Sequence, residues 1–304
     1  MRILVIKLGA LGDFVQALGP AAAIRRHHRD AEITLLTTAP YAELGRAAPY
    51  FDRVWIDERP SFFDPLGVWR LRRLLRGGGF DRVYDLQTSD RSSFYHRLMM
   101  PGAPLWSGIA RGASHRHDNP RRDFMHTLDR QAEQLKLAGI AAVPPPDLSW
   151  AARDIAHFGL PEKLLLLVPG GSAHRPRKRW PVGHFAALAV LAARRGWTAA
   201  VIGGAQEREL GAVITERCPT ARDLTGRTGF GEIVGLARAA RHAVGNDTGP
   251  MHLIAASGCP ATVLYSAESD PALTAPRGPH VSILRRPDLA DLGIEEVAAT
   301  LRFG

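Results

Sequence analysis

The chain has 304 residues, of which 45% are hydrophobic, enough for two domains with separate cores. Its net charge of +9 is spread over both halves and predicts acidic partners such as nucleotide phosphates, a phosphorylated sugar or anionic lipid. No apolar run reaches the roughly 20 residues of a membrane span, and two cysteines fit a reducing cytosol. No spacing resembles a zinc site, a zinc finger or a helix-turn-helix, so neither a metal nor nucleic acid is predicted.

The N-terminal stretch predicts a strand, a glycine turn and a helix. Residues 2–8 (RILVIKL) read as a buried parallel strand, residues 9–13 (GALGD) as the turn, and residues 14–28 as the helix. Lys7 and Asp13 interrupt the apolar run, which argues against a cleaved signal peptide. The turn lacks the GxGxxG fingerprint of dinucleotide-binding folds.

Asp13 has two interpretations. It lies where a strand ends and a helix begins, so its carboxylate could take a proton from a sugar hydroxyl. Alternatively, Asp13 with Gln16 three residues later forms a capping box, which is a structural device.

Further along the first half, strands predicted at 32–37, 51–56 and 80–86 alternate with helical stretches, which is typical of a doubly wound parallel sheet. Residues 111–122 are rich in arginine and histidine and form either a solvated loop or a contact for an acidic acceptor. Residues 62–76 (FFDPLGVWRLRRLLR) form a basic amphipathic helix. It either packs on the sheet with its arginines in water or lies on an anionic membrane surface.

Three consecutive prolines at 144–146 break regular structure, and we place the domain boundary near Pro145, giving domains 1–145 and 146–304. The opening pattern then recurs: residues 163–168 are a buried strand, and Gly170, Gly171 and Ser172 form a glycine turn. Four cations follow at Arg175, Arg177, Lys178 and Arg179, in a basic loop that is either solvated or suited to a pyrophosphate.

Residues 244–258 (VGNDTGPMHLIAASG) predict a strand, a polar turn and a helix that begins at Pro250. Helix N-termini attract anions, so this turn either binds a nucleotide diphosphate or is a capped helix with nothing bound. Asp247 and Thr248 could hold a ribose or phosphate oxygen, with His252 one turn further. Glu207 begins another helix and would stabilise its dipole in any case.

Taken together and in this order, several segments resemble glycosyltransferase family nine, the ADP-heptose:lipopolysaccharide heptosyltransferases. The most specific is GNDTGPMHLIAASGCP at 245–260. The others are IKLGALGD at 6–13, PGG at 169–171, KRWP at 178–181, VIGGAQERE at 201–209 and DLTGRTGFGEIVGLARAA at 223–240. The resemblance covers most of the chain.

The resemblance implies an α/β, GT-B fold: two Rossmann-like domains facing across a cleft, the first for the acceptor and the second for the nucleotide-sugar. We allow for the last helix packing back toward the first domain. The resemblance also implies inverting transfer without a metal or cofactor, from ADP-heptose as donor substrate to a lipopolysaccharide core or similar anionic glycan. We expect a cytoplasmic protein attached peripherally to the inner face of the plasma membrane.

The residue roles follow position by position from that resemblance. Asp13 matches the catalytic base, and Lys178 matches the residue that neutralises donor phosphate. The expected donor-binding residues are Gly170, Gly171, Ser172, Lys178, Glu207, Asp247, Thr248, Gly249 and His252. The expected acceptor-binding residues are Lys7, Arg111 and Arg116.

Two segments depart from the family pattern. The loop at 172–177 is longer and more basic, and residues 266–270 (SAESD) replace a glycine-rich turn. The second departure leaves open a protein that binds a nucleotide-sugar without turning it over. A GT-B nucleotide-sugar epimerase is a third interpretation.

Overall fold

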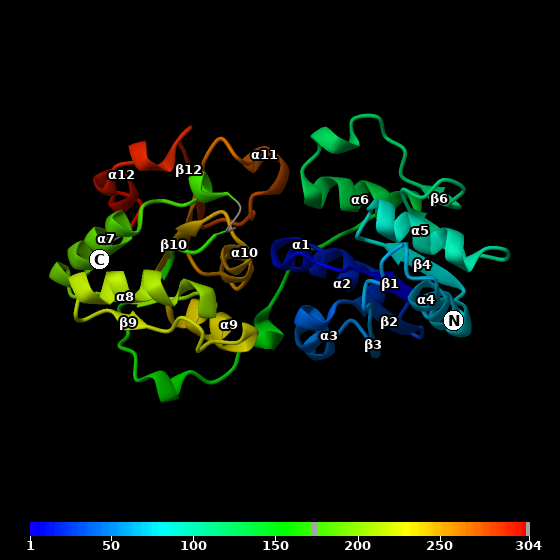
Figure 1. The fold of residues 1–304 in the computed structure, drawn as a ribbon, viewed down its shortest axis with the longest axis horizontal. Helices are drawn as coiled ribbons and strands as arrows, with labels where there is room; N and C mark the ends of the chain where they lie inside the picture. Colours follow the sequence, from blue (N-terminus) through cyan, green and yellow to red (C-terminus); the bar gives the residue numbers. More distant parts are fainter. Residues whose placement is uncertain (172–174, 302–304) are drawn as a thin grey trace. The chain divides into compact units, whose positions relative to one another are not determined.

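The structure, a computed structural model, describes residues 1–171 and 175–301, which divide into two compact units at Pro146 and Asp147. Each unit contains a parallel sheet of six strands among its described residues, with helices packed on it (Figure 1). The doubly wound α/β arrangement predicted for both halves is confirmed.

The sheet of the first unit runs in the order β3-β2-β1-β4-β5-β6. Its strands are β1 (Arg2–Ile6), β2 (Glu32–Thr37), β3 (Arg53–Ile56), β4 (Arg82–Asp85), β5 (Leu105–Gly108) and β6 (His115–Arg116). Its helices are α1 (Leu11–Gln16), α2 (Leu18–His27), α3 (Ala42–Ala47), α4 (Pro65–Gly77), α5 (Asp90–Met99) and α6 (Thr127–Leu137).

The sheet of the second unit runs in the order β12-β11-β10-β7-β8-β9, the same winding as the first. Its strands are β7 (Leu164–Val168), β8 (Thr198–Val201), β9 (Arg222–Asp223), β10 (His242–Asn246), β11 (Ala261–Tyr265) and β12 (Val281–Arg285). Its helices are α7 (Val182–Arg194), α8 (Arg208–Arg217), α9 (Phe230–Ala239), α10 (Gly249–Ala256), α11 (Pro271–Thr274) and α12 (Ile294–Ala298). The last helix packs against α7, and Val297 belongs to the core of this unit.

The helix predicted at 14–28 is two helices, because it contains Pro20. Proline lacks an N–H and its ring clashes with the carbonyl four residues earlier. The chain therefore ends α1 at Gln16 and starts α2 at Leu18, which places Pro20 in the first turn of α2. Two separate 3-10 turns, at Ser149–Ala151 and Ala156–Phe158, precede β7.

In both sheets the strand order reverses between two central strands, β1 and β4 in the first and β7 and β10 in the second. Ligands of open α/β sheets bind beyond the carboxyl ends of strands at such a reversal. The segments that follow these four strands are therefore where each unit is expected to bind a substrate.

Candidate active site

In the second unit, the turn between β10 and α10 contains a buried hydroxyl group, that of Thr248, without a hydrogen-bond partner among the described residues. Thr248 is the N-cap residue of α10, but its side chain makes no capping hydrogen bond. Its Oγ1 is buried and has no hydrogen-bond partner among the described residues. A buried hydroxyl without a partner is destabilising, so this position beside the first N–H groups of α10 suits a ligand oxygen. Gly249 and Pro250 open the helix.

Asn246, at the end of β10, joins three segments of this edge. Its side-chain oxygen accepts from the backbone N–H of Trp180 at 2.9 Å. Its amide donates to the carbonyl oxygens of Pro169 at 2.8 Å and Gly170 at 3.1 Å. Asn246 is fully buried, so these hydrogen bonds fix both ends of the loop between β7 and α7 to the end of β10.

Lys178 and Asp247 form a close ion pair beside this turn, with Nζ 2.6 Å from Oδ2. Their side chains are only 13% and 11% exposed, so water screens the pair weakly. Ser269 donates from Oγ to the same carboxylate oxygen at 2.8 Å. Burial alone would raise the pKa of Asp247, but the hydrogen bonds from Lys178 and Ser269 and the lysine charge hold that pKa below its ordinary value.

The remaining predicted donor residues surround the same edge. Glu207 is buried, and its Oε2 accepts from the backbone N–H of Gly204 at 2.7 Å, so it caps its own turn. A Cβ on Gly170 would lie 2.9 Å from Cγ of Glu207, which explains the glycine there. Arg179 donates to the carbonyl oxygen of Gly171 at 2.6 Å. His252 is buried one turn into α10. Ser172 lies outside the described residues.

The first unit contains a hollow of about 760 Å³ at the carboxyl ends of β1, β2 and β4. Its lining includes the turn after β1 and the aromatic rings of Tyr41 and Phe62. Its charged lining residues are two cations, Arg59 and Arg91, and one carboxylate, Asp90. Gly9 has φ +132, and a Cβ there would meet the ring of Tyr41. Glycine is therefore required for the turn to pass beside that ring.

Asp13 lies in the first turn of α1, three residues after Ala10 of the hollow's lining, and is partly exposed, but its own side chain does not line the hollow. The N-cap of α1 is Ala10, which makes no side-chain cap, so the capping box of Asp13 and Gln16 is not formed. Burial raises the pKa of Tyr41, and the negative charge of Asp13 raises it further. The carboxylate is thus near enough to a ring of the hollow to act on it electrostatically.

None of the three cations predicted for the acceptor lines this hollow. Lys7 is buried, and its Nζ donates to the carbonyl oxygen of Leu86 at 3.3 Å. Burial lowers the pKa of Lys7, while the charges of Asp13 and Asp85 oppose that effect. Arg111 and Arg116 are exposed near the edge strand β6, and neither lines the hollow. Arg59 and Arg91 do line the hollow. They follow β3 and β4 in the chain, and this placement after strands could have identified them as acceptor-binding candidates from the sequence.

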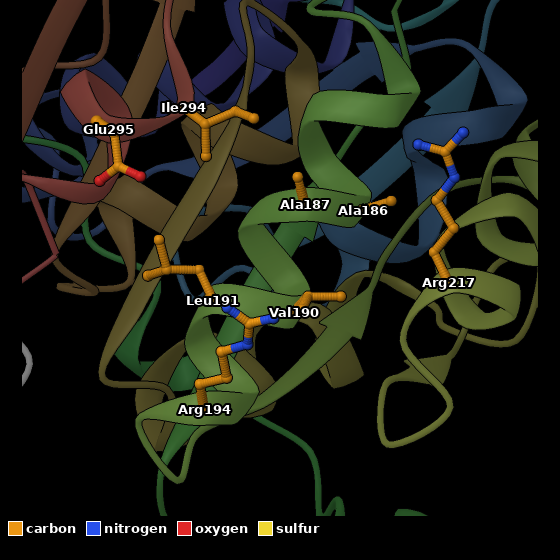
Figure 2. Close-up of a pocket in the computed structure, with 8 residues that line it drawn as sticks. All are labelled: Ala186, Ala187, Val190, Leu191, Arg194, Arg217, Ile294 and Glu295. Carbon is orange, nitrogen blue, oxygen red and sulfur yellow. The ribbon is translucent and has the colours of Figure 1, made fainter.

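A second hollow, of about 470 Å³, lies on the second unit between α7 and the start of α12 (Figure 2). Its larger apolar lining residues are Val190, Leu191 and Ile294. The charged side chains that line it are Arg194, Arg217 and Glu295. None of the predicted donor residues lines it, so it is separate from the candidate site.

Two further observations concern the described part of the chain. It contains no cluster of three or more histidine, cysteine, aspartate or glutamate side chains arranged for a metal ion. None of its helices combines the length and apolar character needed to cross a bilayer.

Comparison with known proteins decides the family. A profile of glycosyltransferase family 9 (heptosyltransferase) matches residues 68–297. The chain belongs to this family. It is therefore a glycosyltransferase, as the sequence motifs predicted. It is 33% identical to lipopolysaccharide heptosyltransferase 2 of Salmonella typhimurium over 94% of this chain and 88% of that one. It is 26% identical to lipopolysaccharide heptosyltransferase 2 of Escherichia coli over the same shares of the two chains.

Solved structures of this glycosyltransferase family share the fold. The ADP-heptose lipopolysaccharide heptosyltransferase II of E. coli matches with a TM-score of 0.82 and 24% identity, over 99% of this chain and 97% of that one. A family 9 glycosyltransferase from Veillonella parvula matches with a TM-score of 0.84 and 21% identity, over 98% and 95% of the two chains. An E. coli heptosyltransferase solved with ADP-2-deoxy-2-fluoro heptose matches with a TM-score of 0.77 and 21% identity, covering 98% of both chains.

Proposed function

We propose that this glycosyltransferase moves a heptose from ADP-heptose to a lipopolysaccharide core acceptor, with inversion at the sugar and without a metal ion. The observation that carries the proposal is the group formed by Lys178, Asp247 and Thr248 at the strand reversal of the second unit. Support for the sugar and the acceptor comes from the relatives, which are named lipopolysaccharide heptosyltransferases.

The second unit would hold the donor. Lys178 brings a positive charge, and the N-terminus of α10 adds a partial one through the helix dipole. Together they suit the diphosphate of a nucleotide-sugar, whose negative charge grows as the bond to the sugar breaks. The partnerless hydroxyl of Thr248 would donate to an oxygen of the same group.

The first unit would hold the acceptor in the hollow lined by Arg59 and Arg91. Two guanidinium groups there favour an anionic glycan, because arginine binds carboxylate and phosphate through paired N–H groups. Asp13 is the proposed general base, since it is partly exposed, its charge acts on the Tyr41 ring of this hollow, and it is not used as a helix cap.

The proposed reaction is a single displacement. The Asp13 carboxylate accepts the proton of an acceptor hydroxyl, and the oxygen attacks the anomeric carbon from the side opposite the diphosphate. The new glycosidic bond forms as the carbon–oxygen bond to the diphosphate breaks, and ADP leaves with the electron pair. Attack from the opposite side inverts the anomeric configuration. Lys178 and the start of α10 stabilise the departing charge.

Transfer from ADP-heptose to a delipidated lipopolysaccharide core glycan tests the proposal. We expect a product one heptose heavier by mass spectrometry, with inverted anomeric configuration by NMR and an unchanged rate in EDTA. Asp13→Asn should lower the rate by a factor of about 10² to 10⁴, because the general base is lost. Asp30→Asn, an exposed carboxylate in the same unit, is the matched control and should retain the rate.

Three outcomes would contradict the proposal. Donor binding without transfer to any acceptor would indicate a binding protein. Isomerisation of the nucleotide-sugar in the absence of acceptor would indicate an epimerase. Full activity of Asp13→Asn would remove this residue from the chemistry.

A further inference from the structure

The segment from Phe62 to Leu74 concentrates apolar surface on the first unit. Of the large apolar side chains exposed among the described residues, half lie in this segment. Phe63 is 96% exposed, Phe62 and Leu66 are each 55% exposed, and Trp69 is 53% exposed. A contiguous apolar surface of this kind marks an interaction site, whereas single exposed apolar residues do not.

Helical geometry places the exposed side chains on one face of α4. Leu71 and Leu75 are buried in the core that α4 shares with the sheet. With 3.6 residues per turn, positions 66, 69, 70 and 73 lie on the opposite face. That face therefore presents Leu66 and Trp69 together with Arg70 and Arg73 to solvent.

The helix itself carries only positive charges on this face, although Glu58 and Asp64 share a neighbouring hollow with Arg70. No acidic residue occurs within Pro65–Gly77, and Asp64, just before it, is used as the N-cap and accepts from the backbone N–H of Gly67. Arg73 lies 5.6 Å from the ring of Trp69. Arg76 donates to the carbonyl oxygen of Met100 at 2.7 Å, which brings a further exposed apolar side chain beside the helix.

This surface is continuous with the proposed acceptor hollow. Phe62 lines the hollow, and its ring lies 5.1 Å from that of Phe94. Arg91 lies 5.0 Å from the Phe62 ring and donates to the carbonyl oxygen of Pro60 at 3.2 Å. The start of the apolar surface is thus fixed to the rim of the hollow.

We propose that the α4 surface, formed by Phe62, Phe63, Leu66, Trp69, Arg70 and Arg73, docks on an anionic lipid bilayer. Aromatic and aliphatic side chains enter the headgroup region, and the arginines bind lipid phosphates. Because Phe62 belongs both to the α4 surface and to the lining of the acceptor hollow, docking brings the hollow to the membrane in which a glycolipid acceptor is anchored. This second step rests on the proposed function, whereas the docking itself does not.

Vesicle flotation of the full chain tests the docking. We expect it to float with equimolar phosphatidylglycerol and phosphatidylcholine, to stay behind with phosphatidylcholine alone, and to detach in high salt. Phe63→Ser with Trp69→Ser should weaken binding at least about tenfold, because two apolar anchors are lost. Arg70→Gln with Arg73→Gln should weaken it about fivefold for each charge.

Matched control variants on the same unit distinguish binding through this surface from non-specific adsorption to vesicles. Phe124→Ser changes an 81% exposed phenylalanine, and Arg29→Gln with Arg46→Gln removes two exposed charges elsewhere. Both controls should bind vesicles as the unchanged chain does. Circular dichroism spectra should match for all variants.

Activity separates docking from catalysis. Phe63→Ser with Trp69→Ser should retain transfer to a soluble delipidated acceptor and lose it in part with an acceptor embedded in vesicles. Equal flotation of variants and unchanged chain would overturn the docking proposal. Concentration-dependent self-association that these substitutions abolish would also overturn it, since the surface would then join two copies. Absence of transfer to every acceptor would instead count against the proposed function and leave the flotation result standing.

Discussion

Asp13 and Asp247 lie at the carboxyl edges of the two sheets, each where a central strand gives way to a helix, yet their surroundings differ. Asp247 lies between β10 and α10, with 11% of its side chain exposed, and accepts from Lys178 and Ser269. Asp13 lies in the first turn of α1 and is partly open to solvent. The same strand-to-helix connection thus holds one carboxylate in a closed ion pair and leaves the other accessible.

This difference suits two kinds of chemistry. A general base needs an open approach for the hydroxyl that gives up its proton. A residue that orients a charged ligand or a lysine benefits from low exposure, because electrostatic attraction is stronger away from water. The predictions that follow test whether the two carboxylates are separated in this way.

The largest expected effect on stability comes from breaking the ion pair of Lys178 and Asp247. Lys178→Ala leaves the buried charge of Asp247 without its cation and should lower the free energy of unfolding by on the order of 4 kcal/mol. Adding Asp247→Ala should recover much of that loss, because no unpaired charge remains. Urea denaturation of the two single variants and the double variant gives the coupling energy. Additive losses would mean that the pair does not act as a unit.

The two units should also differ in their response to pH. Burial raises the pKa of Asp85 in the first unit from 3.8 to about 6, despite the backbone N–H groups that donate to it. The folded state therefore keeps this proton when the unfolded chain has lost it. Stability should fall as pH rises from about 4 to about 6, by about 3 kcal/mol, and Asp85→Asn should abolish the fall.

Asp247 should show the opposite sign. Its pKa is held below 3.8, so its contribution to stability is present above that pH and is lost as the pH falls further. Urea denaturation at a series of pH values, for the unchanged chain, Asp85→Asn and Asp247→Asn, separates the two. The same pH profile for both variants would contradict the assigned environments.

The smallest expected effect comes from Ser269. Ser269→Ala removes one donor to the Asp247 carboxylate and should lower the free energy of unfolding by about 1 kcal/mol. The loss of stability on acidification should begin at higher pH, since the Asp247 carboxylate loses a stabilising hydrogen bond and its pKa rises. Ser269→Thr keeps the hydroxyl and should behave as the unchanged chain. An unmoved acid transition of Ser269→Ala in urea denaturation at a series of pH values would limit this residue to packing.

Sequence reasoning located the strands and the segments at their ends because both signals are local. Apolar runs such as 164–168 predict buried strands, and Pro250 after a polar turn predicts a helix start. Those two signals placed Lys178, Asp247 and Thr248 in segments that follow strands, and the resemblance to glycosyltransferase family nine assigned all three to the donor. The break between α1 and α2 was also predictable from Pro20, and its omission was an error of local reading.

The contacts that assemble the site were not predictable in the same way. Asn246 bonds to residues 66 to 77 positions away, and Ser269 comes from a turn that looked like a departure from the family pattern. Such pairings depend on how the strands are ordered in the sheet. Arg59 and Arg91 share the first hollow for the same reason, because β3 and β4 bring their following loops to one edge.

In the proposed reaction the second unit binds the donor diphosphate, and Asp13 takes part only in the proton transfer. Isothermal titration of ADP into the unchanged chain, Lys178→Gln and Asp13→Asn separates these two roles. Lys178→Gln should weaken ADP binding at least about tenfold, because a charge-assisted contact to the diphosphate is lost. Asp13→Asn should bind ADP as the unchanged chain does. Unchanged ADP affinity in Lys178→Gln, or lost affinity in Asp13→Asn, would contradict the account.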